Sequence, residues 1–67
     1  MKIHYDQQDD ILHIEFSGEP IIKDVSSSWN VNIGYAKNGI AEITVLDAKA
    51  GGYWPLENAK ELLLMAA

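Results

Sequence analysis

The residues best suited to chemistry are two histidines and a glutamate near the start of the chain, His4, His13 and Glu15. If the segments that carry them pair as a hairpin, His4 and His13 lie directly opposite each other, with Cβ atoms about 4.5–5.5 Å apart. That spacing lets two imidazoles share a metal ion, and catalytic zinc needs three protein ligands, which Glu15 would complete. Exposed histidines on a polar strand face are the simpler interpretation. We therefore assign no metal site and no cofactor, and keep His4, His13 and Glu15 as the candidates should a metal bind.

The other polar clusters have structural interpretations. Asp6, Asp9 and Asp10 crowd one short loop, but their spacing does not match the EF-hand calcium loop. We expect Asp6 to cap the turn through its side chain and Asp10 to accept backbone N–H bonds there. The serines at 26–28 have no histidine base within reach, and no Lys or Arg closely follows the glycine pair at 51–52. The sequence therefore predicts no catalytic residue, and we expect no enzymatic activity.

A first hairpin must position the histidines. Residues 2–6 and 11–17 alternate between polar and apolar side chains, the period typical of half-buried strands, and residues 7–10 form the polar loop between them. One register puts apolar against apolar and lysine against glutamate. Its pairs are Tyr5–Leu12 and Ile3–Ile14 on the inner face, and His4–His13 and Lys2–Glu15 on the outer face.

A second hairpin is predicted at Asn38-Gly39, a strong hairpin signal. A two-residue loop at Asn38-Gly39 would set core residues against polar ones, so we predict a three-residue loop over 37–39 with Gly39 in the left-handed region. The resulting pairs are Val31–Val45, Ile33–Ile43 and Tyr35–Ala41 inside, and Asn32–Thr44 and Gly34–Glu42 outside. Residues 21–25 form a candidate edge strand.

The end of the chain has a helical pattern. Pro55 suits the first turn of a helix, and apolar residues recur at helical spacing through Leu62 and Leu63, which predicts a helix over 55–66. The expected fold is therefore α+β: an antiparallel β-meander of two hairpins with four to five strands over 2–48, followed by one C-terminal α-helix. We expect one small domain over 1–67.

Size and charge constrain the function. A domain of about 60 residues buries only about 60% of the surface that its unfolded chain exposes, and the chain has no cysteine for disulfides. We therefore expect a homo-oligomer, a dimer or a higher even order. The net charge of −5 and the lack of arginine argue against nucleic acid and membrane surfaces as partners, and favour a basic protein as a possible partner. Because the first residues lack an apolar signal core and no run is long enough to span a membrane, we expect a cytoplasmic protein.

Large apolar side chains are the candidates for an interface, because aromatic residues are enriched at interface hot spots. The candidate interface residues are Trp29, Tyr35, Leu46, Tyr53, Trp54, Leu62 and Leu63.

Spaced identities over residues 2–48 resemble the domain-of-unknown-function 2283 family of small bacterial proteins. The matching positions are Tyr5, Asp6, Asp10, Leu12 and Ile14, followed by Gly39, Ile43, Leu46, Asp47 and Ala48. The resemblance implies a short β-meander with a C-terminal helix and no established activity, and some relatives resemble the antitoxin-side partners of small toxin genes. The chain departs from the family at His13, where Tyr is frequent, at Gly34, where an acidic residue is common, and at residues 42–44.

These observations rank three hypotheses. The first is a non-enzymatic oligomerising domain for protein–protein interaction. The second is an antitoxin-like regulatory partner of a basic protein, and the third is a small metal-dependent hydrolase at His4, His13 and Glu15.

Overall fold

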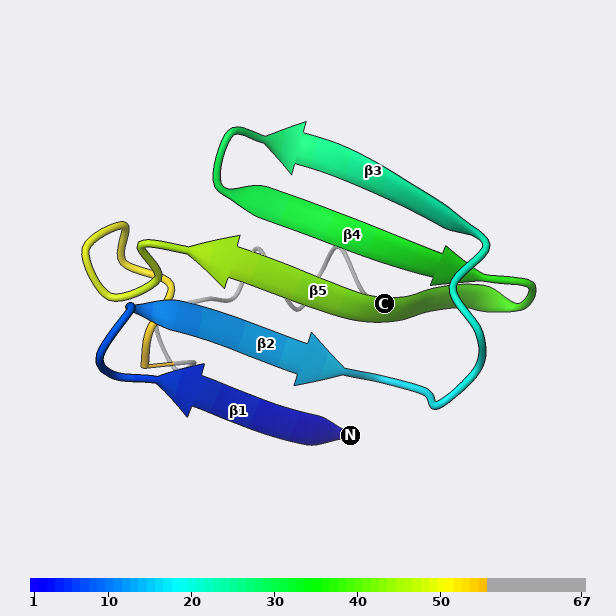
Figure 1. Cartoon of the computed structure of the whole chain (residues 1–67), viewed down its shortest axis with the longest axis horizontal. Helices are drawn as coiled ribbons and strands as arrows, with labels where there is room; N and C mark the ends of the chain where they lie inside the picture. The colour runs from blue at the N-terminus through cyan, green and yellow to red at the C-terminus, as the bar shows by residue number, and fades with distance from the viewer. Residues whose placement is uncertain (56–67) are drawn as a thin grey trace.

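The computed structural model describes residues 1–55, which form a five-stranded antiparallel sheet (Figure 1). Its strands are β1 (Lys2–Asp6), β2 (Ile11–Glu15), β3 (Lys23–Ser28), β4 (Val31–Ala36) and β5 (Gly39–Leu46). The strand order is β1-β2-β5-β4-β3, so β1 and β3 are the edges and β5 lies at the centre.

The first hairpin has the predicted register. Tyr5 pairs with Leu12 and Ile3 with Ile14, while His4 faces His13 across the two strands. The alternation in the sequence is sufficient for this result, because a slip of one residue would turn Leu12 and Ile14 out of the core.

The second hairpin has two of the three predicted inner pairs, Val31–Val45 and Ile33–Ile43, but the third is wrong, because Tyr35 pairs with Ile40 and not with Ala41. Its turn also differs from the prediction. Ile33 pairs with Ile43 as expected, yet Ala36 pairs with Gly39, so the connection is the two residues 37–38. The register then shifts, because Tyr35 faces Ile40 whereas Gly34 faces Glu42. The predicted three-residue loop is therefore wrong, because the extra residue lies within β5 as a bulge at Ala41. The Ala41 carbonyl accepts hydrogen bonds from the N–H groups of residues 16 and 17, at 2.7 and 3.2 Å, as the chain leaves β2.

The topology is not a plain meander, because β2 pairs with β5 rather than with β3. Residues 16–22 carry the chain from β2 along one end of the sheet to its far edge, where β3 begins (Figure 1). Leu12 faces Val45 and Ile14 faces Ile43 across the β2–β5 pair. The two hairpins thus share one apolar face with their most hydrophobic strands at its centre. The edge strand expected over 21–25 does lie at an edge, but it spans Lys23–Ser28.

The α+β class is wrong for this chain. The described residues form a sheet with no helix among them, so the fold they show is all-β. The segment from Asp47 to Trp54 is a series of turns rather than the start of a helix, with the Gly51, Tyr53 and Trp54 N–H groups bonded to the carbonyls of Asp47 and Ala48. The helix predicted over 55–66, apart from Pro55, falls outside the described residues.

The core lies on one face of the sheet. Leu12, Ile14, Ile43 and Val45 are fully buried, and Val31, Ile33 and Ala48 belong to the same cluster. Partly buried aromatic rings from Tyr5, Phe16, Tyr35, Tyr53 and Trp54 pack against this cluster. In residues 1–55, no helix is long and apolar enough to cross a bilayer.

Candidate functional site

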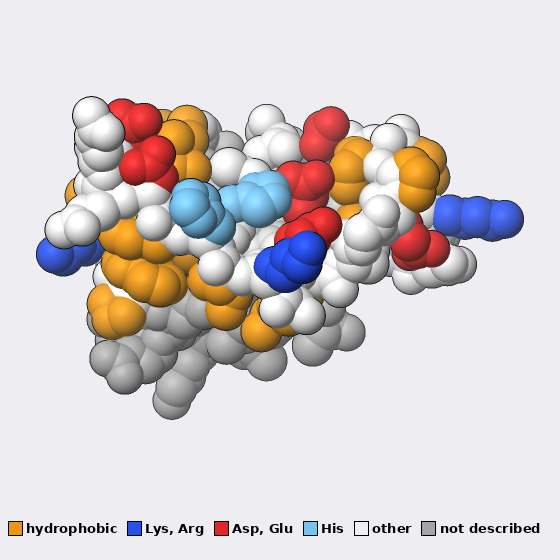
Figure 2. All heavy atoms as spheres, turned by 60° about the horizontal axis from the view of Figure 1, so that its bottom comes forward, with side chains coloured by type: hydrophobic (Ala, Val, Ile, Leu, Met, Phe, Trp, Pro, Cys, Tyr) orange, Lys and Arg blue, Asp and Glu red, His pale blue; other side chains and the backbone are white. Residues whose placement is uncertain are grey.

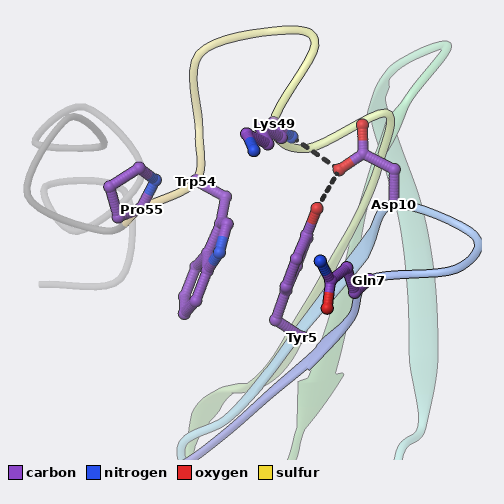
Figure 3. A pocket seen from close by; sticks show the side chains of 6 residues that line it. All are labelled: Tyr5, Gln7, Asp10, Lys49, Trp54 and Pro55. Atoms are coloured by element: carbon purple, nitrogen blue, oxygen red, sulfur yellow. Dashed lines mark hydrogen bonds between the residues drawn. The ribbon is translucent and has the colours of Figure 1, made fainter.

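Asp10 ties the first turn to the segment that follows β5 (Figure 3). Its Oδ1 accepts hydrogen bonds from the Tyr5 hydroxyl at 2.7 Å and from the Lys49 backbone N–H at 2.8 Å. Its Oδ2 accepts a bond from the Ala50 N–H at 3.2 Å, and its carbonyl accepts one from the Ala48 N–H at 3.0 Å. Asp10 adopts a left-handed backbone with φ of 55°, which an aspartate tolerates better than most residues. One side chain therefore holds two segments that lie 39 residues apart.

The hydrogen bonds at Asp10 favour its charged form. The Lys49 N–H, then the Tyr5 hydroxyl, lower the pKa of the Asp10 carboxyl below its ordinary value. The same carboxylate raises the pKa of the Tyr5 phenol, because the phenol donates to it and would lose that bond on ionising. Asp10 therefore acts as a charged hydrogen-bond acceptor in these contacts.

An aromatic stack lies beside this carboxylate. The rings of Tyr5 and Trp54 are 4.7 Å apart between centroids and 15° from parallel, an offset-stacking distance. A cavity of about 650 Å³ borders the stack and is lined by Tyr5, Gln7, Asp10, Lys49, Trp54 and Pro55 (Figure 3). The stack and the hydrogen bonds of Asp10 together hold the chain after β5 against the first hairpin.

The backbone donors expected for Asp10 lie in its own turn, whereas the observed donors are Lys49 and Ala50. The predicted role of Asp6 is observed. Its Oδ1 accepts hydrogen bonds from the backbone N–H groups of Gln8 and Asp9 at 3.0 and 3.2 Å. The carboxylates of Asp6 and Asp10 therefore both serve as acceptors for backbone N–H groups.

The outer face of the sheet carries two polar rows that cross the strands. Figure 2 shows the two histidine side chains next to each other, with acidic side chains beside them. The strand registers define the first row as His4, His13, Thr44, Asn32 and Ser26. The second row is Lys2, Glu15, Glu42, Gly34 and Asp24.

His13 lies in the first row between His4 and Thr44 and makes two polar contacts. Its Nδ1 is 3.0 Å from the Thr44 hydroxyl, and its Nε2 is 3.5 Å from Oε2 of Glu42. Glu15 faces Glu42 and not a histidine. Of the three predicted candidates, His4 and His13 therefore come together, whereas the nearest carboxylate is Glu42. In residues 1–55, no three His, Cys, Asp or Glu groups already form a metal-holding cluster.

Glu42 and Thr44 are site residues that sequence reasoning did not assign. Both were expected on the outer face, opposite Gly34 and Asn32, which is what the structure shows. Their contact with His13 depends on the pairing of β2 with β5, which the expected meander did not include.

Apolar side chains are exposed at both ends of edge strand β3. Ile22 precedes it with 70% of its surface exposed, and Trp29 follows it with 77% exposed. Trp29 faces outward beside the buried Asn30, whose amide donates to the Leu46 carbonyl at 3.1 Å and fixes the turn to β5. Trp29 and Leu46 share a hollow of about 130 Å³.

The remaining interface candidates have other positions. Tyr35, Tyr53 and Trp54 are partly buried and pack against the core of their own chain. Leu62 and Leu63 lie outside the described residues.

The comparison with protein families shows which family the chain belongs to. The model of the family "Protein of unknown function (DUF2283)" matches residues 2–49. The chain belongs to this DUF2283 family. The match spans all five strands of the described sheet and ends at Lys49, whose N–H binds Asp10. No curated protein and no solved structure matches the chain significantly.

Proposed function

We propose that this DUF2283 protein is a non-enzymatic interaction domain that self-associates through the edge strand β3. The observation that carries the proposal is Trp29, a large aromatic side chain with 77% of its surface exposed at the end of that edge. Tryptophan is among the residues most enriched at the centres of protein interfaces. Together with Ile22 and Leu46 it gives the β3 edge an apolar contact at each end.

The backbone of β3 supports the same surface. In the described sheet β3 pairs only with β4, so its other side presents backbone groups that a further strand can bond. Antiparallel pairing with a second copy about a two-fold axis at Val25 sets Val25 against Val25 and Asp24 against Ser26. An axis at Asp24 or at Lys23 would oppose like charges, which is unfavourable. The register at Val25 therefore avoids the like-charge pairs of the two neighbouring registers on the Lys23 side.

The polar side chains of the described residues support a binding role over catalysis. The Ser28 hydroxyl donates to Asn30 at 2.8 Å, and His13 contacts Thr44 and Glu42 rather than a serine. Asp10 is used as a hydrogen-bond acceptor for a loop. These contacts give Ser28, His13 and Asp10 a structural partner each.

A basic protein is the second candidate partner. The net charge of −5 favours it, because opposite charges speed association and improve specificity. In this version the chain acts as the acidic member of a pair, similar to an antitoxin-side protein.

Molar mass by light scattering tests the proposal. We expect a dimer at high micromolar concentration, with Trp29→Ser raising the dissociation constant by at least about tenfold, the loss expected for an interface hot spot. Ile3→Ser is the matched control, because Ile3 lies on the opposite edge strand and is 42% exposed. Circular dichroism confirms that both variants stay folded. A wild-type chain that remains monomeric up to millimolar concentration would refute self-association.

A further inference from the structure

We propose that the outer face of the sheet binds a divalent transition-metal ion of the zinc class through His13 and Glu42, with His4 as the third ligand. This inference goes beyond the interaction role and does not depend on it. The ligands come from three neighbouring strands, His4 from β1, His13 from β2 and Glu42 from β5.

The spacing of two of these groups fits a metal ion. The Nε2 of His13 and Oε2 of Glu42 are 3.5 Å apart, too long for a good hydrogen bond. Nitrogen and oxygen ligands lie about 2.0–2.2 Å from zinc, so two ligands of a tetrahedral ion stand roughly 3.3–3.6 Å apart. The two atoms are therefore already at the separation that one shared ion requires.

Thr44 orients the histidine for this role. The Nδ1 of His13 lies 3.0 Å from the Thr44 hydroxyl oxygen. When Nδ1–H donates to that oxygen, the lone pair of the neutral ring is on Nε2, the atom that faces Glu42. Metal-binding histidines generally have such a partner on the second ring nitrogen, which fixes the tautomer and the ring direction.

His4 supplies the third ligand by turning its side chain. It lies directly opposite His13 and is exposed, and since β1 and β5 flank β2, its imidazole must extend over His13 toward β5 to reach the ion. No three ligating groups of the described residues form a cluster before this rotation. Zinc accepts three protein ligands and leaves the fourth position to water or to another molecule.

Two further features place Glu42 where the ion needs it. A Cβ at Gly34 would come within 2.8 Å of Glu42 Cγ, so the glycine leaves space for the glutamate side chain in its present position. Glu15 faces Glu42 across β2 and β5, and two opposed carboxylates repel each other, although Lys2 on the other side of Glu15 offsets part of this repulsion. A divalent cation beside Glu42 would relieve this repulsion, and the imidazoles select zinc, copper or nickel over magnesium and calcium.

Isothermal titration of the full chain, without an affinity tag, with zinc chloride tests the site. We expect one zinc ion per chain, no measurable heat with magnesium, and loss of zinc binding in His13→Ala. Thr44→Val should weaken zinc binding by about tenfold, the effect typical of a group behind a metal ligand. His4→Ala and Glu42→Gln should each weaken it by at least as much.

Matched controls separate the site from adventitious binding. Asp24→Asn removes a carboxylate from the same row at the far edge, and should leave the zinc affinity unchanged. Trp29→Ser should also bind zinc normally, so failure of the self-association proposal leaves this result interpretable. Wild-type zinc affinity in a folded His13→Ala variant, or equal binding of zinc and magnesium, would overturn the proposed site.

Discussion

At the scale of single residues, Asp10 is the side chain that joins the first turn to the segment after β5. It accepts hydrogen bonds from one hydroxyl and two backbone N–H groups of other segments. Tyr5, held by this carboxylate, stacks in turn on Trp54. A change in the charge of Asp10 should therefore reach the segment that follows β5.

The lowered pKa of Asp10 predicts acid sensitivity. Because the pKa is lower in the folded chain than in the unfolded chain, the charged carboxylate stabilises the fold above the unfolded value of about 4. This contribution is lost as the pH falls from about 4 through the folded pKa. We expect Asp10→Asn to lower the melting temperature at pH 7 and to flatten its decline below pH 4, measured by circular dichroism.

Asp9→Asn is the control for that experiment. Asp9 lies in the same turn and the substitution removes the same charge, but no hydrogen bond of the Asp9 carboxylate occurs in the described part of the chain. Equal effects of the two variants at pH 7 would show that net charge, and not the tie from Asp10, sets the stability.

At the scale of elements, the sequence predicted the pairs within each hairpin but not the pairing between them. The alternation of Ile3, Tyr5, Leu12 and Ile14 left one register that buries the apolar side chains. The β2–β5 pair joins strands that are distant in sequence. The inner residues of β2 would match those of β4 almost as well as those of β5. The bulge at Ala41 was also not predicted. The Ala41 carbonyl accepts hydrogen bonds from the N–H groups of residues 16 and 17. A backbone contact of that kind has no side-chain signature.

The turn of the second hairpin depends on Gly39. Its φ of 130° lies in a region that residues with a Cβ rarely adopt. Gly39→Ala should therefore destabilise the chain by roughly 1–3 kcal/mol, the usual cost of such a backbone, measured by urea unfolding. The cost is backbone strain and not crowding, since nothing lies within 4 Å of a Cβ built there.

Gly18→Ala provides the comparison for this strain. Gly18 also has open space around it, and its φ is outside the positive range. The substitution should be neutral or stabilise by up to about 1 kcal/mol, because alanine restricts the unfolded chain. If Gly18→Ala destabilised as much as Gly39→Ala, the explanation from the backbone of the turn would be wrong.

At the scale of the whole molecule, charge distinguishes the two kinds of partner. Each copy carries a net charge of −5, so self-association brings like charges together, whereas a basic partner brings opposite charges together. Salt screens both interactions, since the Debye length is about 10 Å at 0.1 M and about 3 Å at 1 M ionic strength. Salt should therefore change the two affinities in opposite directions.

Sedimentation equilibrium at about 50 mM and about 500 mM sodium chloride measures whether salt raises or lowers the affinity, because the Debye length shortens over that range. If copies pair through the apolar residues at the β3 edge, the dimer should become severalfold tighter at the higher salt. Trp29→Ser should lose affinity at both salt concentrations, since its contribution is burial of apolar surface and not charge. A dimer that weakens with salt would instead require opposite charges across the interface. Lys23 and Asp24 are the adjacent charges on β3 that could supply them, and the self-pairing register would then have to move away from Val25.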